Sequence, residues 1–250
     1  MAYLEKECKH GSIIEVEKYT SGRYGKKKQN GTPAGETPPE QIKWQVKNDI
    51  KKVWRILGWN FKPGDWWIFL SFKPKYRPKT PAEGKSTVQK FFRKLRVLYE
   101  KEGQKLKYVF SAGRTKGGAF HLHMVINKFD AAKISDLWAD IANNGEYSVK
   151  TFTPLEKKKD WEAVASYIIK NGEEDFNSDN PTFKKRFCNS TNLKIKKVKP
   201  KIVKAKQWKK EPPERKGYYI DKERSYSGFN SYGYPVQYTV YVELSTKDSG

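Results

Sequence analysis

Hydrophobic and polar positions alternate most strictly over residues 120–126 (FHLHMVI). Successive side chains of a β-strand point to opposite faces, so this alternation predicts a strand whose apolar side chains face a core. His121 and His123 then share the other face, about 6–7 Å apart along the strand. Two imidazoles at that spacing can bind one divalent metal ion, and a pair of ordinary strand histidines is the alternative. The chain has three histidines in all, and this motif contains two of them.

Helical spacing of the apolar positions predicts four helices. The segment from Pro39 to Gly58 has apolar residues at i, i+4 and i+7/8, and residues 87–101 form the most regular amphipathic pattern. Two shorter segments with the same period cover residues 131–142 and 160–171.

Further strands are predicted at residues 66–72, 106–111 and 147–153. From residue 66 onward the order is therefore strand, helix, strand, strand, helix, strand. This βαββαβ order predicts an α+β fold of the ferredoxin-like or RRM-like kind, with a central antiparallel sheet and helices on one face. The histidine face of residues 120–126 would then be the open face of the sheet.

Charge and cysteine usage narrow the class of protein. The formal net charge of the 250 residues is +23, which exceeds what solubility alone requires and predicts a nucleic-acid partner. Cys8 and Cys188 belong to no C-x-x-C, which suggests neither a zinc site nor a disulfide framework. The sequence shows no signal-like N-terminus and no apolar run of membrane length, so we expect a cytoplasmic protein without a membrane partner.

A second motif lies in the predicted helix over residues 160–171. At about 100° per residue, Tyr167, Lys170 and Asn171 fall together on one flank of its apolar stripe. A phenol oxygen is a competent nucleophile toward a phosphodiester when a metal ion polarises the phosphate. A nearby cation favours the phenolate as it attacks. Alone, Y-x-x-K is too short to indicate a function, but its combination with H-x-H is much more specific.

On these motifs the chain resembles the rolling-circle replication initiators (Rep proteins) of the HUH endonuclease superfamily. It is most similar to the single-tyrosine Rep proteins of plasmid and phage type. The resemblance covers residues 60–192, and a looser likeness extends to residue 243. Residues 60–65 (NFKPGD) resemble the family's first motif, His121-Leu122-His123 its metal motif, and residues 167–170 (YIIK) its nucleophile motif.

The resemblance implies a reaction inside a bacterial host cell. His121 and His123 would hold Mg²⁺ or Mn²⁺ on a phosphate of single-stranded DNA at a replication origin, and Tyr167 would attack that phosphate. The products would be a 5′-phosphotyrosine link and a free 3′-OH that primes replication, and the link would later be resealed. Lys170 would position the reacting groups or stabilise charge. The sequence has no ATP-binding motif, so a host helicase is the expected partner.

One position departs from the family pattern. Many relatives carry a glutamate as third metal ligand eight residues before the first histidine, where this chain has Gly113. The Asn171 amide, water together with substrate oxygens, or a distant carboxylate could replace it. Two imidazoles alone predict weak metal binding without DNA and a preference for Mn²⁺ over Mg²⁺. Gly113→Glu is then expected to tighten metal binding, unless the glycine is required for a positive φ angle.

The C-terminal third is rich in lysine from Lys184 to Lys210, and this density predicts contact with a phosphate backbone. Phe187 and Trp208 offer surfaces on which bases could stack. The candidate DNA-binding residues are Arg114, Lys116, Lys184, Lys185, Arg186, Lys194, Lys196 and Lys197.

We predict three parts of the chain. Residues 1–59 form a strand, a flexible loop and a helix that packs on the core, and residues 60–192 form the endonuclease domain. Residues 193–250 form a basic extension, in which strands at 215–220 and 237–243 make a hairpin on the endonuclease domain.

Two other functions remain open. A non-catalytic nucleic-acid-binding protein with an RRM-like sheet would stack bases on exposed aromatic side chains, but it would not require H-x-H paired with Y-x-x-K. An HUH transposase or relaxase would keep the chemistry and change the biological role. Relaxases tend to carry a third histidine close by, and His10 is far away in sequence.

Overall fold

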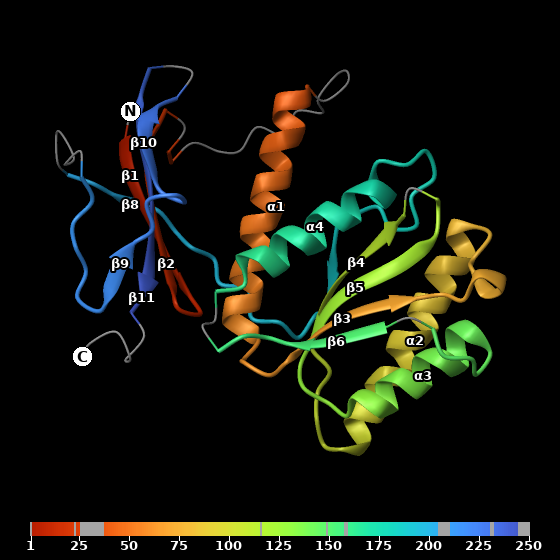
Figure 1. Ribbon diagram of the computed structural model, residues 1–250. Coiled ribbons are helices and arrows are strands. Elements are labelled where there is room, and N and C mark those ends of the chain that lie inside the picture. Colours follow the sequence, from red (N-terminus) through yellow and green to blue (C-terminus); the bar gives the residue numbers. More distant parts are fainter. Residues whose placement is uncertain are drawn as a thin grey trace. The chain divides into compact units, whose positions relative to one another are not determined.

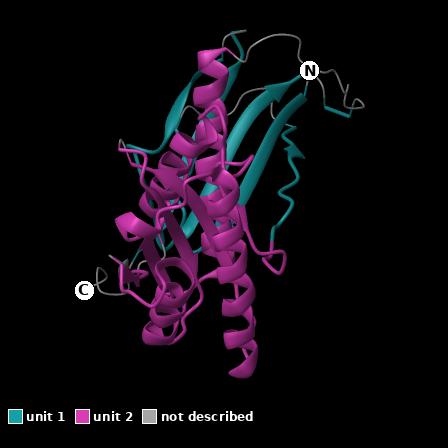
Figure 2. Cartoon of the chain, turned by 90° about the vertical axis from the view of Figure 1, so that its right-hand side faces the viewer, with its two compact units in different colours: residues 1–37, 195–250 teal, residues 38–194 magenta. Residues whose placement is uncertain are grey.

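The computed structural model describes residues 2–22, 24–25, 38–115, 117–148, 150–157, 160–204, 211–230 and 233–244. The chain divides into two compact units, which are coloured separately in Figure 2. One unit comprises residues 38–194, and the other combines residues 1–37 with residues 195–250.

An antiparallel sheet in the order β6-β3-β5-β4-β7 forms the centre of the unit of residues 38–194 (Figure 1). Its strands are β3 (Trp66–Ser71), β4 (Tyr108–Arg114), β5 (Phe120–Ile126), β6 (Lys150–Pro154) and β7 (Cys188–Asn189). Helix α2 (Pro81–Lys101) follows β3, and helix α3 (Ala131–Asn143) follows β5. The predicted α+β fold with the order βαββαβ is therefore confirmed.

One face of this sheet packs against α2 and α3. The core between them contains Ile68 and Leu122 from the strands, Phe91 and Leu95 from α2, and Trp138 from α3. Burial of large apolar side chains in such a core is the main stabilising contribution to the unit.

Helix α2 begins six residues earlier than the predicted start at Thr87. The Thr80 hydroxyl accepts a hydrogen bond from the Glu83 backbone N–H, and Pro81 occupies the first turn. A threonine N-cap followed by proline is a strong helix start. The hydrophobic period alone does not show it, because the first turn of α2 carries few apolar residues.

The opposite face carries the histidines, and it is not open as predicted. Helix α4 (Glu162–Phe176) packs on β4, and helix α1 (Pro39–Asn60) packs on α4, on the side of the sheet away from α2 and α3 (Figure 1). Gly172 permits the close approach of α4, because a Cβ atom there would lie 2.0 Å from the Arg186 carbonyl oxygen.

The second unit is a separate antiparallel sheet in the order β10-β11-β2-β1-β8, and β9 also pairs with β11. Its strands are β1 (Ala2–His10), β2 (Ile13–Ser21), β8 (Lys201–Ile202), β9 (Tyr218–Ile220), β10 (Tyr226–Phe229) and β11 (Pro235–Glu243). Strand β11 pairs with β2 over residues 237–242 and 13–18, so the two ends of the chain form one sheet.

This division differs from the predicted three parts. Helix α1 belongs to the unit of residues 38–194, and the predicted N-terminal strand belongs with the C-terminal residues. Strands β9 and β11 do pair with each other, but they belong to the sheet of β1 and β2. The predicted loop after residue 20 and the predicted tail at 245–250 lie largely or wholly outside the described residues. Over the described part of the chain, no helix combines the length and apolar character needed to cross a membrane.

Candidate active site

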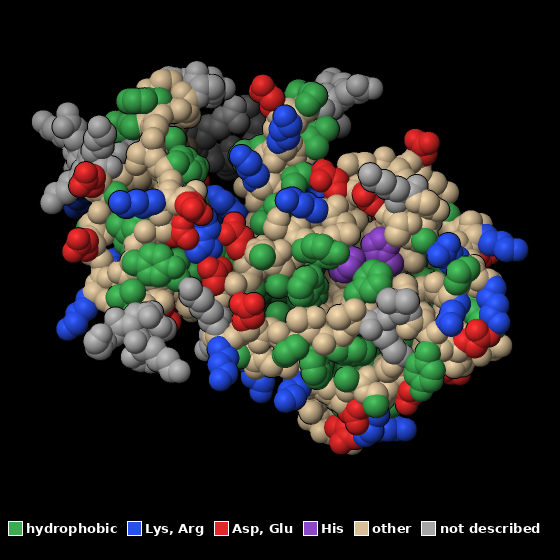
Figure 3. All heavy atoms as spheres, in the orientation of Figure 1, with side chains coloured by type: hydrophobic (Ala, Val, Ile, Leu, Met, Phe, Trp, Pro, Cys, Tyr) green, Lys and Arg blue, Asp and Glu red, His purple; other side chains and the backbone are tan. Residues whose placement is uncertain are grey.

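His121 and His123 lie on β5, which is flanked by β3 and β4. Their ring centroids are 5.0 Å apart, and Phe69 of β3 packs beside both rings at 5.5 and 4.9 Å. Both histidines are mostly buried, yet histidine atoms reach the surface among hydrophobic side chains (Figure 3). The two imidazoles are therefore held side by side by a rigid strand and an aromatic neighbour.

The protonation of these rings suits metal binding. Burial, reinforced by the neighbouring His121, lowers the pKa of His123 to about 3, so this ring is neutral at ordinary pH. The Nδ1 atom of His121 lies 3.2 Å from the Ala119 carbonyl oxygen. If Nδ1 carries the proton and donates it to that carbonyl, Nε2 keeps its lone pair for a metal ion.

Tyr167 of α4 lies directly beside this pair. Its ring meets the His123 ring edge to face at a centroid distance of 4.7 Å and the Trp67 ring at 5.4 Å. Tyr167 is 44% exposed, so the residue is accessible from solvent. The fold thus brings together the two motifs that the sequence pattern singled out.

Lys170 and Asn171 follow Tyr167 by one helical turn. Lys170 is exposed on the same helix. The Asn171 side-chain NH₂ donates a hydrogen bond to the Tyr167 backbone carbonyl at 2.8 Å. This bond holds the amide group against the backbone of α4.

Gly113 of β4 is the register partner of His121. A Cβ atom at this position would lie 2.6 Å from His121 Nε2 and 2.9 Å from the Asn171 backbone oxygen. Its φ is not in the left-handed region, so the alternative of a positive φ is wrong. The glycine is required because β4, the imidazole and α4 approach closely. The expected benefit of Gly113→Glu conflicts with this contact, since any side chain would press on the imidazole.

A cleft of about 660 Å³ opens beside His121. Phe69, Phe120 and Tyr147 supply aromatic surface, and Lys73 and Arg77 supply positive charge. Sequence reasoning did not select Lys73 or Arg77, although the basic, proline-rich stretch directly after β3 was an available signal. Aromatic and cationic side chains together are typical of single-stranded nucleic-acid sites.

Both predicted DNA-binding arginines have structural partners instead. Arg114 donates to Asp175 at 3.1 Å and to Thr182 at 3.3 Å. Arg186 is buried, pairs with Asp49 at 3.2 Å and stacks over the Phe176 ring. Their guanidinium groups are committed to the fold, which argues against phosphate contacts.

The predicted lysines fall into different parts of the molecule. Lys184 and Lys185 are exposed and line a second cleft together with Lys85. Lys194 is exposed in the same unit, whereas the exposed Lys196 and Lys197 belong to the other unit. Lys116 lies outside the described residues.

The proposed stacking surfaces are not supported. Phe187 is 8% exposed and packs under the Lys52 ammonium group, so a base cannot lie on it without rearrangement. Trp208 lies outside the described residues.

The first motif, residues 60–65, has a structural role. The Asp65 carboxylate accepts hydrogen bonds from the backbone N–H groups of Lys62 and Lys128. The Asn60 side-chain NH₂ donates a hydrogen bond to the Lys194 carbonyl, and the Asn60 side-chain oxygen accepts one from the Lys194 backbone N–H. These bonds fix the loop that leads into β3.

Residues 65–175 match a family model described as Replication-associated protein ORF2. This part of the chain is similar to replication-associated proteins. The matched segment begins directly before β3 and ends in α4, so it includes both histidines and Tyr167. The match supports a rolling-circle replication initiator that acts on origin DNA. A comparison with curated proteins and one with solved structures found no significant match.

Proposed function

We propose that this protein cuts and rejoins single-stranded DNA at a replication origin, with Tyr167 as the nucleophile, and so initiates rolling-circle replication. The observation that carries the proposal is the contact between the Tyr167 and His123 rings, which come from different elements of the fold. The match of residues 65–175 to replication-associated proteins supports the biological role.

The residues present fit a divalent metal ion. His121 and His123 would hold Mn²⁺ or Mg²⁺ through imidazole nitrogens, and Asn171 or substrate oxygens would complete the ligand set. When bound, the ion would polarise the scissile phosphate as a Lewis acid. The absence of a side chain at Gly113 spares Nε2 of His121 a steric contact, because a Cβ atom there would lie 2.6 Å from it.

In the cutting step the Tyr167 hydroxyl oxygen attacks the phosphorus and loses its proton to solvent. The bond from phosphorus to the 3′-oxygen breaks, and that oxygen takes up a proton to become a free 3′-OH. The 5′-phosphate remains on Tyr167. Lys170, one turn along the helix, stabilises the negative charge of the phenolate and phosphate. Attack of a 3′-OH on the phosphotyrosine reverses the step and rejoins DNA.

The cleft beside His121 is positioned to hold the DNA strand next to the cut. Lys73 and Arg77 would contact its phosphates, and the aromatic side chains of the cleft would stack on its bases. Unwinding of the duplex falls to a helicase of the host, and the reaction takes place in the cytoplasm.

The test is a covalent adduct on a denaturing gel. The full chain is mixed with Mn²⁺ and overlapping single-stranded oligonucleotides that tile the replicon encoding it. We expect DNA labelled at its 3′ end to move with the protein and DNA labelled at its 5′ end to be released. Tyr167→Phe should abolish the adduct and leave DNA binding nearly intact.

Tyr219→Phe is the matched control, because Tyr219 is 42% exposed and belongs to the unit without the candidate active site. Its adduct should equal that of the parent protein. An adduct that survives in Tyr167→Phe would show that another residue is the nucleophile. DNA binding with no adduct for the parent would favour the non-catalytic alternative.

A further inference from the structure

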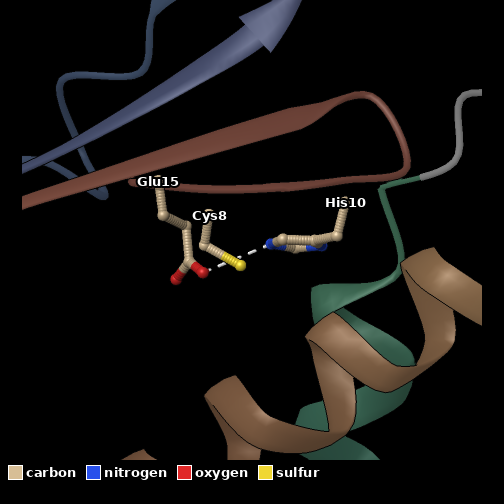
Figure 4. Close-up of side chains that lie close together, drawn as sticks. All are labelled: Cys8, His10 and Glu15. Atoms are coloured by element: carbon tan, nitrogen blue, oxygen red, sulfur yellow. Dashed lines mark ion pairs between the residues drawn. The ribbon is translucent and has the colours of Figure 1, made fainter. Parts of the chain in front are cut away.

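A cluster of Cys8, His10 and Glu15 lies in the β1–β2 hairpin, in the unit that does not contain the candidate active site. Cys8 and His10 are two residues apart on β1, so their side chains point to the same face. Glu15 of β2 is the register partner of Cys8 and points to that face as well. Figure 4 shows the three side chains turned toward one another.

The spacing of the three groups matches a metal site. One ligand atom from each residue lies within 4.8 Å of the others, and His10 Nε2 is 3.3 Å from Glu15 Oε2. Bond lengths of about 2.3 Å for Zn–S and about 2.0–2.1 Å for Zn–N place tetrahedral ligand atoms roughly 3–4 Å apart. Small side-chain rotations are therefore enough to bring the three atoms onto one ion.

We propose that Cys8, His10 and Glu15 bind one zinc ion. A thiolate, an imidazole and a carboxylate are all zinc ligands, and the thiolate disfavours Mg²⁺ and Ca²⁺. Water takes the fourth position. The proposal is independent of the proposed function, because no residue of the candidate active site takes part.

Tyr238 of β11 provides further support. Its hydroxyl donates a hydrogen bond to Glu15 Oε1 at 2.5 Å, while Oε2 is directed toward His10. A hydrogen bond of this kind orients a metal-binding carboxylate and is typical of the surroundings of metal ligands. It holds one oxygen and leaves the other for the ion.

An ion pair between His10 and Glu15 is the competing explanation. That pair accounts for two of the three residues and requires no thiol. The presence of Cys8 as the third member of the cluster is what distinguishes a metal site from the pair. A test must therefore report on the sulfur atom.

Cobalt(II) is a suitable replacement for zinc, because a cobalt–thiolate bond gives a charge-transfer band in the near ultraviolet. The full chain, reduced and stripped of metal, is titrated with Co²⁺. We expect the band to saturate at one thiolate-bound ion per chain, apart from any ion held by His121 and His123, and to disappear when Zn²⁺ is added. A parent protein that binds no Co²⁺ through sulfur would overturn the proposal in favour of the ion pair.

The variants separate this site from the rest of the chain. Cys8→Ser should lose the band, whereas Cys188→Ser should keep it, because Cys188 belongs to the other unit. His121→Ala combined with His123→Ala should keep it too. His10→Gln retains the thiol and should weaken Co²⁺ binding at least tenfold, which tests the site even if Cys8→Ser fails to fold. A band that persists in Cys8→Ser, or unchanged affinity in His10→Gln, would overturn the proposal.

Discussion

Two strands in this molecule carry metal-binding side chains at the same spacing. They differ in the residues that pair with these side chains on the adjacent strands. On β5, His121 and His123 are two residues apart, and the register partners of His121 are Gly113 of β4 and Ser71 of β3. On β1, Cys8 and His10 are two residues apart, and the register partner of Cys8 is Glu15. The neighbours across the strands are a glycine and a serine in one case and a carboxylate in the other.

This difference decides what a metal ion could do at each place. A carboxylate opposite the strand pair supplies a third protein ligand and leaves one position for water. A glycine leaves several positions, which a phosphodiester and water can occupy. One neighbour on the adjacent strand thus separates a candidate catalytic site from a candidate zinc site.

The tyrosines beside the two sites show the same contrast. Tyr167 is 44% exposed, and its ring makes an edge-to-face contact with the His123 ring. Tyr238 is buried, and its hydroxyl is bonded to Glu15. An exposed phenol is accessible to a substrate, whereas a buried, hydrogen-bonded one positions another side chain.

Gly113→Ala tests the candidate active site at His121 and His123, and its effect should be the largest. The added Cβ atom would lie 2.6 Å from His121 Nε2, so the imidazole must move away from the position that binds metal. We expect adduct formation to slow by roughly ten- to hundredfold, and overpacking to lower the free energy of unfolding by about 1–3 kcal/mol. The measurements are single-turnover adduct formation at saturating Mn²⁺ and thermal unfolding.

Gly117→Ala is the control, because a Cβ atom there meets only the Thr115 hydroxyl oxygen, at 3.8 Å. It should form the adduct at the parent rate. Parent-like adduct formation by Gly113→Ala would show that space beside His121 is not needed for the reaction.

Tyr238→Phe tests the proposed zinc site of Cys8, His10 and Glu15 and should have a smaller effect. Loss of the hydroxyl releases Glu15 Oε1, so the carboxylate is less well oriented toward the ion. We expect Co²⁺ affinity to fall about tenfold while the thiolate band keeps its position. Tyr241→Phe is matched, because Tyr241 lies on the other face of β11 and bonds the Pro213 carbonyl. Equal affinities for the two variants would exclude a role of Tyr238 at the metal.

Much of the candidate active site could be predicted from local patterns. The alternation over residues 120–126 correctly placed both histidines on one face of a strand, and the helical period placed Tyr167 on a flank of α4. Their meeting at 4.7 Å depends on the packing of α4 on β4 and β5, which was not predicted, because the βαββαβ order led us to expect an open histidine face.

The remaining features depend on contacts between distant residues. Pairing of β11 with β2 is invisible to local periodicity, so the second sheet was not predicted. Charge alone did not show that Arg186 is paired with Asp49, a residue of helix α1. The spacing of Cys8 and His10 was a usable signal, since a hairpin around residues 11 and 12 places Glu15 opposite Cys8.

The last prediction concerns how DNA reaches the candidate active site. The expected effect is the smallest of the three. Lys184 and Lys185 line a cleft with Thr182, which bonds Arg114 at the end of β4 nearest His121. If they contact phosphates, replacing both with glutamine should reduce the slope of log affinity against log salt by about 1.4, or about 0.7 per contact on single-stranded DNA. Fluorescence anisotropy at several salt concentrations measures this slope.

Lys101 and Lys105 provide the matched pair of exposed lysines. The Lys105 carbonyl accepts a hydrogen bond from Asn127, directly after the end of β5 farthest from His121. Replacing these two lysines changes the net charge equally but should leave the slope nearly unchanged. An equal decrease of the slope for both pairs would mean that total charge governs DNA binding, rather than the position of Lys184 and Lys185 near the candidate active site.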